Sequence, residues 1–245
     1  MRRGKSRGES KRASVRWAGA RVGLRGPALL LLALIAPPFA PGAEAAPPLV
    51  RQDEVVLEDL IALEVLGRDV YGFDAEGGGR HHVRLELGEV VVSTGQRGRL
   101  ALVVTDRRAL ALAAGLGSWR ELPLRVGEAS AAFDWVAPRV LVVATAQRIL
   151  GFESEHAVWL AIDVGPREVV THVELGASTA VVVTDRHAYG FSPDAGGFFR
   201  ESLRLHEQLE RVTASATLGQ VRTNQRLLVF RSPLGSWLVE ELPIR

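Results

Sequence analysis

The chain has 245 residues, with 30 Lys and Arg, 28 Asp and Glu, and no cysteine. Without cysteine it has no disulfides, no thiolate metal sites, no cysteine nucleophile and no lipid-attachment cysteine. Residues 1–45 hold nine of the basic residues and two of the acids, so residues 46–245 carry 21 Arg against 26 acids, a net charge of −5. The sequence pI of about 9.5 therefore comes from the leading segment, and a nucleic-acid partner is not expected.

Residues 1–45 have the three parts of a secretory signal peptide. A cationic stretch precedes the apolar run GPALLLLALIA, from Gly26 to Ala36, and the small residues AEA stand at Ala43 to Ala45. The run ends at Pro37-Pro38, short of the roughly 20 residues that a spanning helix needs. We therefore expect cleavage near Ala45 and a secreted or periplasmic mature chain without a transmembrane segment. A retained membrane anchor is the alternative.

Residues 46–245 contain a repeat of about 40 residues. Its apolar markers are Phe73, Leu112, Phe152, Phe191 and Phe230, at separations of 39, 40, 39 and 39. Each unit alternates short apolar stretches with turn residues, a pattern typical of short antiparallel strands. In the second unit the stretches read LALVVT, ALALAA, WRELPLR and SAAFDW. Four strands in such a repeat match the blade of a β-propeller.

The ends of the repeat region predict how the ring closes. The fifth unit ends at Arg245, after its third strand, WLVEELPIR. The segment QDEVVLE, from Gln52 to Glu58, stands at the offset of a fourth strand and would complete the last blade. Residues 46–245 thus resemble an all-β, five-bladed β-propeller of four-stranded antiparallel blades, with an N-terminal strand closing the last blade. The WD dipeptide and the kelch double glycine are not at repeat positions, so no named family matches. We expect a monomer.

One rim of this propeller is predicted to carry paired charges. TDR, at Thr105 and again at Thr184, falls at the hairpin between first and second strands, where Thr and Asp can bond local backbone groups. The other hairpin on that rim supplies one acid per unit: Glu89, Glu128, Glu168 and Glu207. Facing them are Arg107, Arg148, Arg186 and Arg226. We predict ion pairs between the two sets, and an arginine ring that binds an anionic ligand is the alternative.

Aromatic residues begin the third strands of four units, at Trp119, Trp159, Phe198 and Trp237. Equivalent large rings are predicted to fill the space between adjacent blades. The alternative is that the tryptophans stack on sugars, as in lectins that present several weak sites to one clustered glycan.

The loops between second and third strands depart from the repeat and lie on the opposite rim. They contain Asp74, Glu76, His81, His82, Glu153, Glu155, His156 and Asp194. Carboxylates and imidazoles on such loops can bind a divalent cation or a polar sugar. Solvated loop tips are the alternative, the sequence specifies no particular metal, and no cofactor is expected.

Catalysis has weak support in the sequence. A glycoside hydrolase needs two carboxylates at the site, and the expected innermost strands offer one acid, Glu64, with Asp134 and Glu174 near the neighbouring connections. Hydrolase and nucleotide-binding motifs are absent. We therefore expect an exported noncatalytic module that binds or assembles a protein or glycan partner in the cell envelope. An envelope glycoside hydrolase or lectin of the same fold is the alternative.

Overall fold

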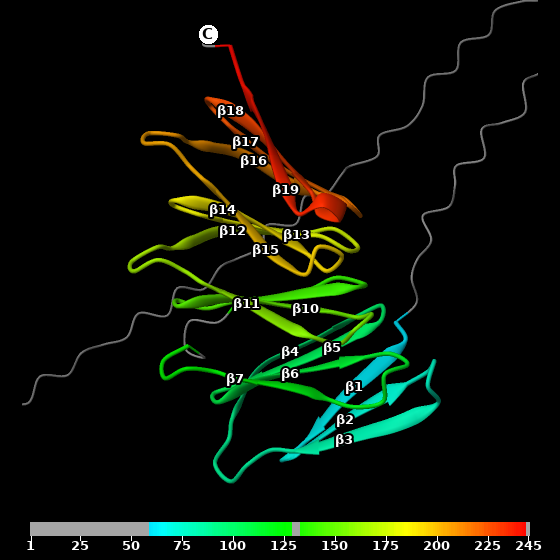
Figure 1. Cartoon of the computed structure of the whole chain (residues 1–245). Coiled ribbons are helices and arrows are strands. Elements are labelled where there is room, and N and C mark those ends of the chain that lie inside the picture. The colour runs from blue at the N-terminus through cyan, green and yellow to red at the C-terminus, as the bar shows by residue number, and fades with distance from the viewer. Residues whose placement is uncertain (1–58, 129–132, 244–245) are drawn as a thin grey trace, which may run out of the picture. The chain divides into compact units, whose positions relative to one another are not determined.

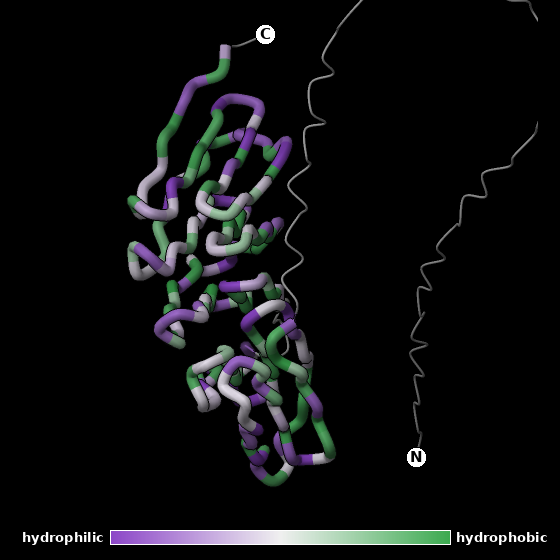
Figure 2. Tube along the Cα trace, turned by 90° about the vertical axis from the view of Figure 1, so that its right-hand side faces the viewer, coloured by the Kyte–Doolittle hydropathy of each residue, from purple (hydrophilic) through white to green (hydrophobic). Residues whose placement is uncertain are grey.

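The computed structural model describes residues 59–128 and 133–243. These residues form antiparallel β-sheets that follow one another in chain order, with β1–β3 at one end of the row and β16–β19 at the other (Figure 1). Figure 2 shows hydrophobic stretches in the strands and hydrophilic stretches at many of the turns, as expected for strands that pack face to face. The all-β fold and the blade-like repeat are thus confirmed.

The first sheet has three described strands, β1 (Ile61–Leu66), β2 (Asp69–Asp74) and β3 (Gly79–Arg84). The second has β4 (Val91–Arg97), β5 (Leu100–Thr105), β6 (Arg108–Ala113) and β7 (Arg120–Pro123). The third has β8 (Phe133–Val136), β9 (Val140–Ala144), β10 (Arg148–Glu153) and β11 (Trp159–Asp163). The fourth has β12 (Val170–Leu175), β13 (Ala180–Thr184), β14 (His187–Ser192) and β15 (Gly197–Ser202). The fifth has β16 (Leu209–Ala214), β17 (Leu218–Thr223), β18 (Arg226–Arg231) and β19 (Ser236–Glu241), with a short 3-10 helix at Ser232–Leu234.

The strands are grouped differently from the sequence prediction. The stretch that was expected to end the second unit contains β8, and β8 pairs with β9, the next strand along the chain. Each four-stranded sheet therefore begins with the strand that was predicted as the fourth of the preceding blade. The cause is local: a two-residue hairpin turn between consecutive strands is easier to form than a pairing across a longer connection.

This grouping also changes the expected closure. The last sheet already has four strands of its own, from β16 to β19, so a strand from the N-terminus is not needed to complete it. The expected strand, Gln52 to Glu58, lies outside the described residues, as does the predicted signal peptide. Closure by that strand is therefore not confirmed.

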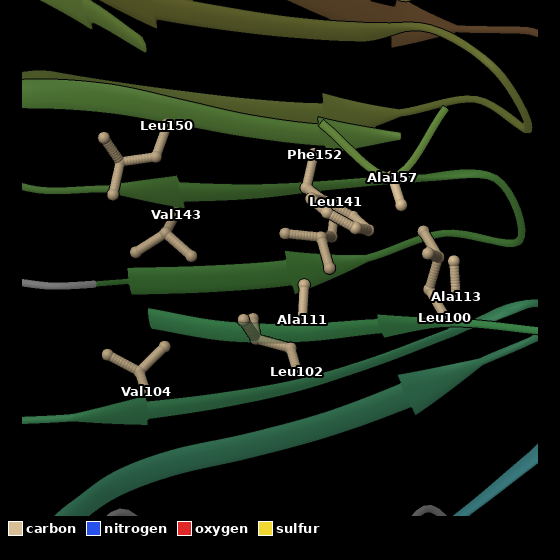
Figure 3. Close-up of a cluster of buried hydrophobic side chains, with 10 residues drawn as sticks. All are labelled: Leu100, Leu102, Val104, Ala111, Ala113, Leu141, Val143, Leu150, Phe152 and Ala157. Carbon is tan, nitrogen blue, oxygen red and sulfur yellow. The ribbon is translucent and has the colours of Figure 1, made fainter. Parts of the chain in front are cut away.

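Each inner sheet packs through two apolar faces. We call the face toward the preceding sheet the upstream face and the face toward the next sheet the downstream face. Figure 3 shows one such interface, where Leu102 and Val104 of the second sheet meet Leu141, Val143 and Phe152 of the third. All of these side chains are buried, so apolar burial between successive sheets is the main stabilising term.

Small residues admit the marker ring of the next sheet. The Phe191 ring of the fourth sheet is fully buried and lies over Gly151 in β10. The Phe230 ring lies over Gly190 in the same way. The repeated pair of a glycine and a large ring therefore sets how closely two sheets approach.

A methyl group at Gly151 is expected to disrupt this contact. Its carbon would lie 2.6 Å from Cε2 of the Phe191 ring, so Gly151→Ala should lower the free energy of unfolding by about 1–3 kcal/mol. Urea denaturation measures the loss. The control is Gly197→Ala, because a Cβ there meets no atom within 4 Å and alanine restricts the unfolded chain. Equal losses in both variants would contradict the packing role of Gly151.

Membrane insertion by a helix finds no support in the described part of the chain. None of its helices has the length and apolar character that crossing a bilayer requires.

Candidate functional site

The candidate site is one rim of the sheets, built from two kinds of loop. The connections from each sheet to the next contribute residues 85–90, 124–128, 164–169 and 203–208. The hairpins β5–β6, β9–β10, β13–β14 and β17–β18 contribute the other half. Hydrogen bonds join the halves: the Val90 amide donates to the Asp106 carboxylate (2.9 Å), and the Asp106 amide donates to the Val90 carbonyl oxygen (2.9 Å). We call this edge the connection rim.

A buried polar node fixes each pair of loops on the connection rim. In the second sheet, the Thr105 hydroxyl donates to Glu89 Oε1 (2.8 Å) and accepts hydrogen bonds from the Arg107 and Arg108 amides. Arg108 Nε donates to the same carboxylate (2.9 Å). The Glu86 amide donates to Glu89 Oε2 (2.7 Å) and closes the turn. One carboxylate thus satisfies donors from both loops, as buried polar groups require.

The node recurs in the next three sheets. Arg148 Nη2 lies 2.6 Å from Glu128 Oε2, and Arg226 Nη2 lies 2.7 Å from Glu207 Oε2. In the fourth sheet His187 Nδ1 lies 2.8 Å from Glu168 Oε1. The side chains of these acids are almost fully buried. The predicted ion pairs are therefore present at Arg148 and Arg226.

Two of the predicted arginines are not the node residues. Arg107 pairs with Glu86 (2.6 Å), and Arg186 lies 3.9 Å from Asp185. The node partner is the residue three positions after each threonine, which is Arg108 in the second sheet and His187 in the fourth. That spacing is visible in the sequence and places the basic residue at the start of the second strand of each hairpin. The hypothesis of an arginine ring for an anionic ligand stays a prediction.

The nodes hold their carboxylates in the charged form. Burial raises the pKa of Glu128, but hydrogen bonds from Arg148 and the Arg125 amide outweigh it, so this pKa lies below its ordinary value. The same balance lowers the pKa of Glu89 and of Glu207, where Arg108 and Arg226 are the donors. The ionised pair is thus the resting state of these three arginine nodes.

The fourth node contains a histidine and a tyrosine. Burial raises the pKa of Glu168, but hydrogen bonds from Thr184, His187 and the Gly165 amide outweigh it, so this pKa lies below its ordinary value. The Tyr189 hydroxyl also donates to Glu168 Oε1 (3.0 Å). Burial and this hydrogen bond raise the pKa of Tyr189 to about 12. The tyrosine is therefore a neutral donor inside the fold.

Apolar side chains project from the tips of the connection rim. Leu87 is 82% exposed and Leu205 is 83% exposed. Val126 is 99% exposed, and Pro166 stands exposed at the equivalent position of the next connection. The residue after each tip has a positive φ: Gly88, Gly127, Arg167 and His206. The same tight turn thus presents one apolar side chain per connection, two positions before the buried acid of the node.

The opposite rim uses its acids as turn caps. Asp74 accepts hydrogen bonds from the amides of Glu76, Gly77 and Gly115. Glu153 accepts from the amides of Glu155 and His156. Burial raises the pKa of Asp74, and these amides lower it to a net decrease. Each capping carboxylate is therefore occupied by backbone donors of its own loop or of the next sheet.

The predicted loop candidates do not form one site. Asp74, Glu76, His81 and His82 belong to the first sheet, Glu153, Glu155 and His156 to the third, and Asp194 to the fourth. In the described ranges, no group of three or more acids and histidines is placed to hold a metal ion. Ligand binding by these residues stays a prediction.

Three of the candidates do meet at one hollow. His81, His82 and Trp119 line a hollow of 410 Å³ between β3 and β7, together with Arg80, Ser118 and Glu121. The Nε2 atom of His81 is itself buried, has no hydrogen-bond partner and lies 3.7 Å from Asp74 Oδ2. A tryptophan bordered by polar side chains suits a hydroxyl-rich ligand.

The tryptophans bridge neighbouring sheets, as predicted. Trp119 Nε1 donates to the His81 carbonyl oxygen (3.3 Å), and Trp159 Nε1 donates to that of Arg120 (3.1 Å). Trp237 Nε1 donates to the Phe199 carbonyl oxygen (2.9 Å). Each indole therefore links the last strand of its sheet to the last strand of the preceding sheet, and sugar stacking stays a prediction.

The acids considered for catalysis lie on three different sheets. Glu64 is exposed in β1, whereas Asp134 and Glu174 lie in β8 and β12. The strands expected to be innermost, β5, β9, β13 and β17, are second rather than edge strands of their sheets. The edge strands β4, β8, β12 and β16 instead contact one another from sheet to sheet.

No protein-family model matches the chain, and no curated protein matches it. Among solved structures it is similar to HIRA residues 644–1017, with a TM-score of 0.38 and 11% identity over 58% of this chain and 52% of that one. It is also similar to Hsv2p of Kluyveromyces lactis (TM-score 0.37, 12% identity, 71% of this chain and 59% of that one). A third is YCF48 bound to D1 peptide (TM-score 0.33, 13% identity, 77% of this chain and 69% of that one). These are β-propeller proteins, the likeness is one of fold alone, and the chain spans about half the length of the HIRA structure.

Proposed function

We propose that this protein is an exported, noncatalytic β-propeller that binds a protein partner in the cell envelope through its connection rim. The observation that carries the proposal is the row of exposed apolar tips, Leu87, Val126, Pro166 and Leu205. Turn residues are usually polar, glycine or proline, so Pro166 suits its turn, whereas Leu87, Val126 and Leu205 have no role in forming theirs. Exposed apolar side chains repeated at equivalent positions along one rim instead favour a binding surface.

The buried nodes make this surface rigid before binding. Glu128 accepts the Arg125 amide on one side of the Val126 tip, and Glu207 accepts the Arg204 amide beside Leu205. A tip that is already ordered loses little conformational entropy when a partner covers it. Paired charges such as Arg107–Glu86 and Arg125–Asp163 surround the tips, which is the polar border expected of a protein interface.

The rim is tested by a triple variant, Leu87→Ser/Val126→Ser/Leu205→Ser. Burying each aliphatic side chain contributes about 1.5–3 kcal/mol, so we expect partner affinity to fall at least about a hundredfold with an unchanged melting temperature. The assay is a pull-down of residues 46–245 from envelope extract, followed by affinity measurement with the captured protein. The matched control is Leu116→Ser/Val158→Ser/Leu234→Ser, whose exposed side chains lie in the loops of the opposite rim. Equal binding by the two variants would contradict the proposal.

Export is a separate part of the proposal. Its support is the sequence of residues 1–45, with cleavage expected near Ala45. N-terminal sequencing of protein from the cell envelope should give a first residue near Ala46. Full-length protein in the cytoplasmic fraction would contradict export and leave the rim proposal untouched.

A glycan partner is the second candidate, and the hollow beside Trp119 and His81 favours it. A glycan-binding screen with wild type and Trp119→Ala tests it. Binding that Trp119→Ala abolishes, and that the serine triple variant keeps, would place a glycan at this hollow.

A further inference from the structure

The two end faces of the row of sheets differ from every inner face. The equivalent upstream positions of the second to fifth sheets are Val103, Val143, Val182 and Val221, and all four are fully buried. The first sheet has Glu64 at this position, and Glu64 is exposed. The marker Phe73 is 47% exposed, whereas its four counterparts are completely buried. Among the described residues, the first sheet therefore has no other sheet on its upstream face.

The downstream face of the last sheet shows the reverse change. Two inward positions that are apolar in the first four sheets are Gln220 and Arg222 in the fifth. Their counterparts in the second sheet are Leu102 and Val104, both fully buried. Arg222 is exposed and pairs with Glu210 at 2.9 Å. Two hollows, of 880 and 310 Å³, are lined by Arg222 on this sheet.

The two charged residues that interrupt the apolar pattern, Glu64 and Arg222, are opposite in charge and stand at positions that face each other between inner sheets. In the interface of Figure 3, Val104 and Val143 belong to the same buried cluster and lie toward the same end of it. The residue equivalent to Val104 on the last sheet is Arg222, and the residue equivalent to Val143 on the first sheet is Glu64. If the two end faces met as the inner faces do, an arginine would stand beside a glutamate, with Gln220 next to both.

In a β-propeller the ring closes with the last sheet against the first, and we propose that a Glu64–Arg222 ion pair joins the downstream face of the last sheet to the upstream face of the first at this seam. A partner face on the same chain is available at high effective concentration. The charges also make this pairing specific. If either end face packed on an apolar inner face instead, its charge would be buried without a partner.

The seam is packed less closely than the inner interfaces. Val229 stands on the last sheet where Gly72, Gly151 and Gly190 admit a large side chain of the next sheet. The Val229 side chain therefore keeps the Phe73 ring from packing on the backbone of the last sheet, as the Phe191 ring packs over Gly151. The ion pair replaces part of the apolar contact that holds the inner sheets together, and this inference does not depend on the proposed binding function.

Cysteine trapping tests the seam in the full mature chain, which has no cysteine of its own. In Glu64→Cys/Arg222→Cys we expect an intramolecular disulfide after mild oxidation, seen by peptide mass spectrometry in a species of monomer mass. The control Glu64→Cys/Glu155→Cys, with its second site on an exposed loop of the third sheet, should form no intramolecular bond. Disulfides only between molecules would overturn the proposal and assign the faces to a second copy.

Charge reversal gives an independent readout that needs no disulfide. Glu64→Arg and Arg222→Glu should each lower the melting temperature, and the double variant should recover the part of the loss that comes from the Glu64–Arg222 pair. If the two end faces did not meet, Arg222 would pair only with Glu210. Adding Glu64→Arg would then not rescue Arg222→Glu. A double variant whose loss equals the sum of the single losses would overturn the seam, while leaving partner binding at the connection rim intact.

Discussion

Glu128→Ala is expected to lower the free energy of unfolding by about 3–5 kcal/mol, because it removes one partner of a buried ion pair. The Glu128 carboxylate is fully buried and accepts two hydrogen bonds from Arg148 and one from Thr145. Without it Arg148 keeps a hydrogen bond to the Pro123 carbonyl oxygen and no carboxylate within ion-pair distance among the described contacts. Urea denaturation followed by circular dichroism measures the change.

An exposed pair in the equivalent turn of the preceding connection supplies the control. Glu86 pairs with Arg107 at 2.6 Å, but both side chains are about half exposed. Glu86→Ala should therefore cost about 0–1 kcal/mol. A double variant, Glu128→Leu/Arg148→Met, should recover part of the loss, because apolar groups of similar size need no partner. Similar losses for Glu128→Ala and Glu86→Ala would show that the node does not stabilise the fold.

The repeat made the fold predictable from the sequence. A marker every 39 or 40 residues, with apolar stretches of strand length between turn signals, leaves few alternatives to a row of small antiparallel sheets. The repeat does not say where a sheet begins, because any frame of one period describes it equally well. The blade boundary was therefore predicted one strand too late, and the pairings of β4 with β5, β8 with β9, β12 with β13 and β16 with β17 correct it.

The buried polar nodes were predicted only in part, for a related reason. The acids were identified correctly, because one glutamate recurs in each connection. Choosing their partners required the register of each hairpin, and Arg107 and Arg108 are equally basic in the sequence. The hydrogen bonds of Thr105 direct the side chain of residue 108 inward, and that of residue 107 meets Glu86 at the surface. The same register makes His187, and not Arg186, the partner of Glu168.

The apolar tips were missed although their signal is periodic. Leu87, Val126, Pro166 and Leu205 recur at the spacing of the markers, but an apolar residue in a β-rich sequence is read as core by default. Their exposure follows from the positive φ of the next residue and from the buried acid behind it. Only the three-dimensional turn shows that these side chains point to solvent.

The free energy of unfolding is expected to fall steeply as the pH drops below about 4.5, the ordinary glutamate value. The pKa of Glu89, Glu128, Glu168 and Glu207 is lowered in the folded state. A lowered folded pKa means that the unfolded chain binds protons first, so this stability is present above the unfolded pKa and is lost as pH falls through the folded pKa.

Glu168→Gln removes one of these groups and should reduce the slope of stability against pH. Urea denaturation of wild type and variant between about pH 6 and pH 3 measures both slopes. Repeating it in high salt separates the nodes from surface pairs, since buried pairs are screened less. Identical slopes in wild type and Glu168→Gln would mean that the fourth node carries no linked proton.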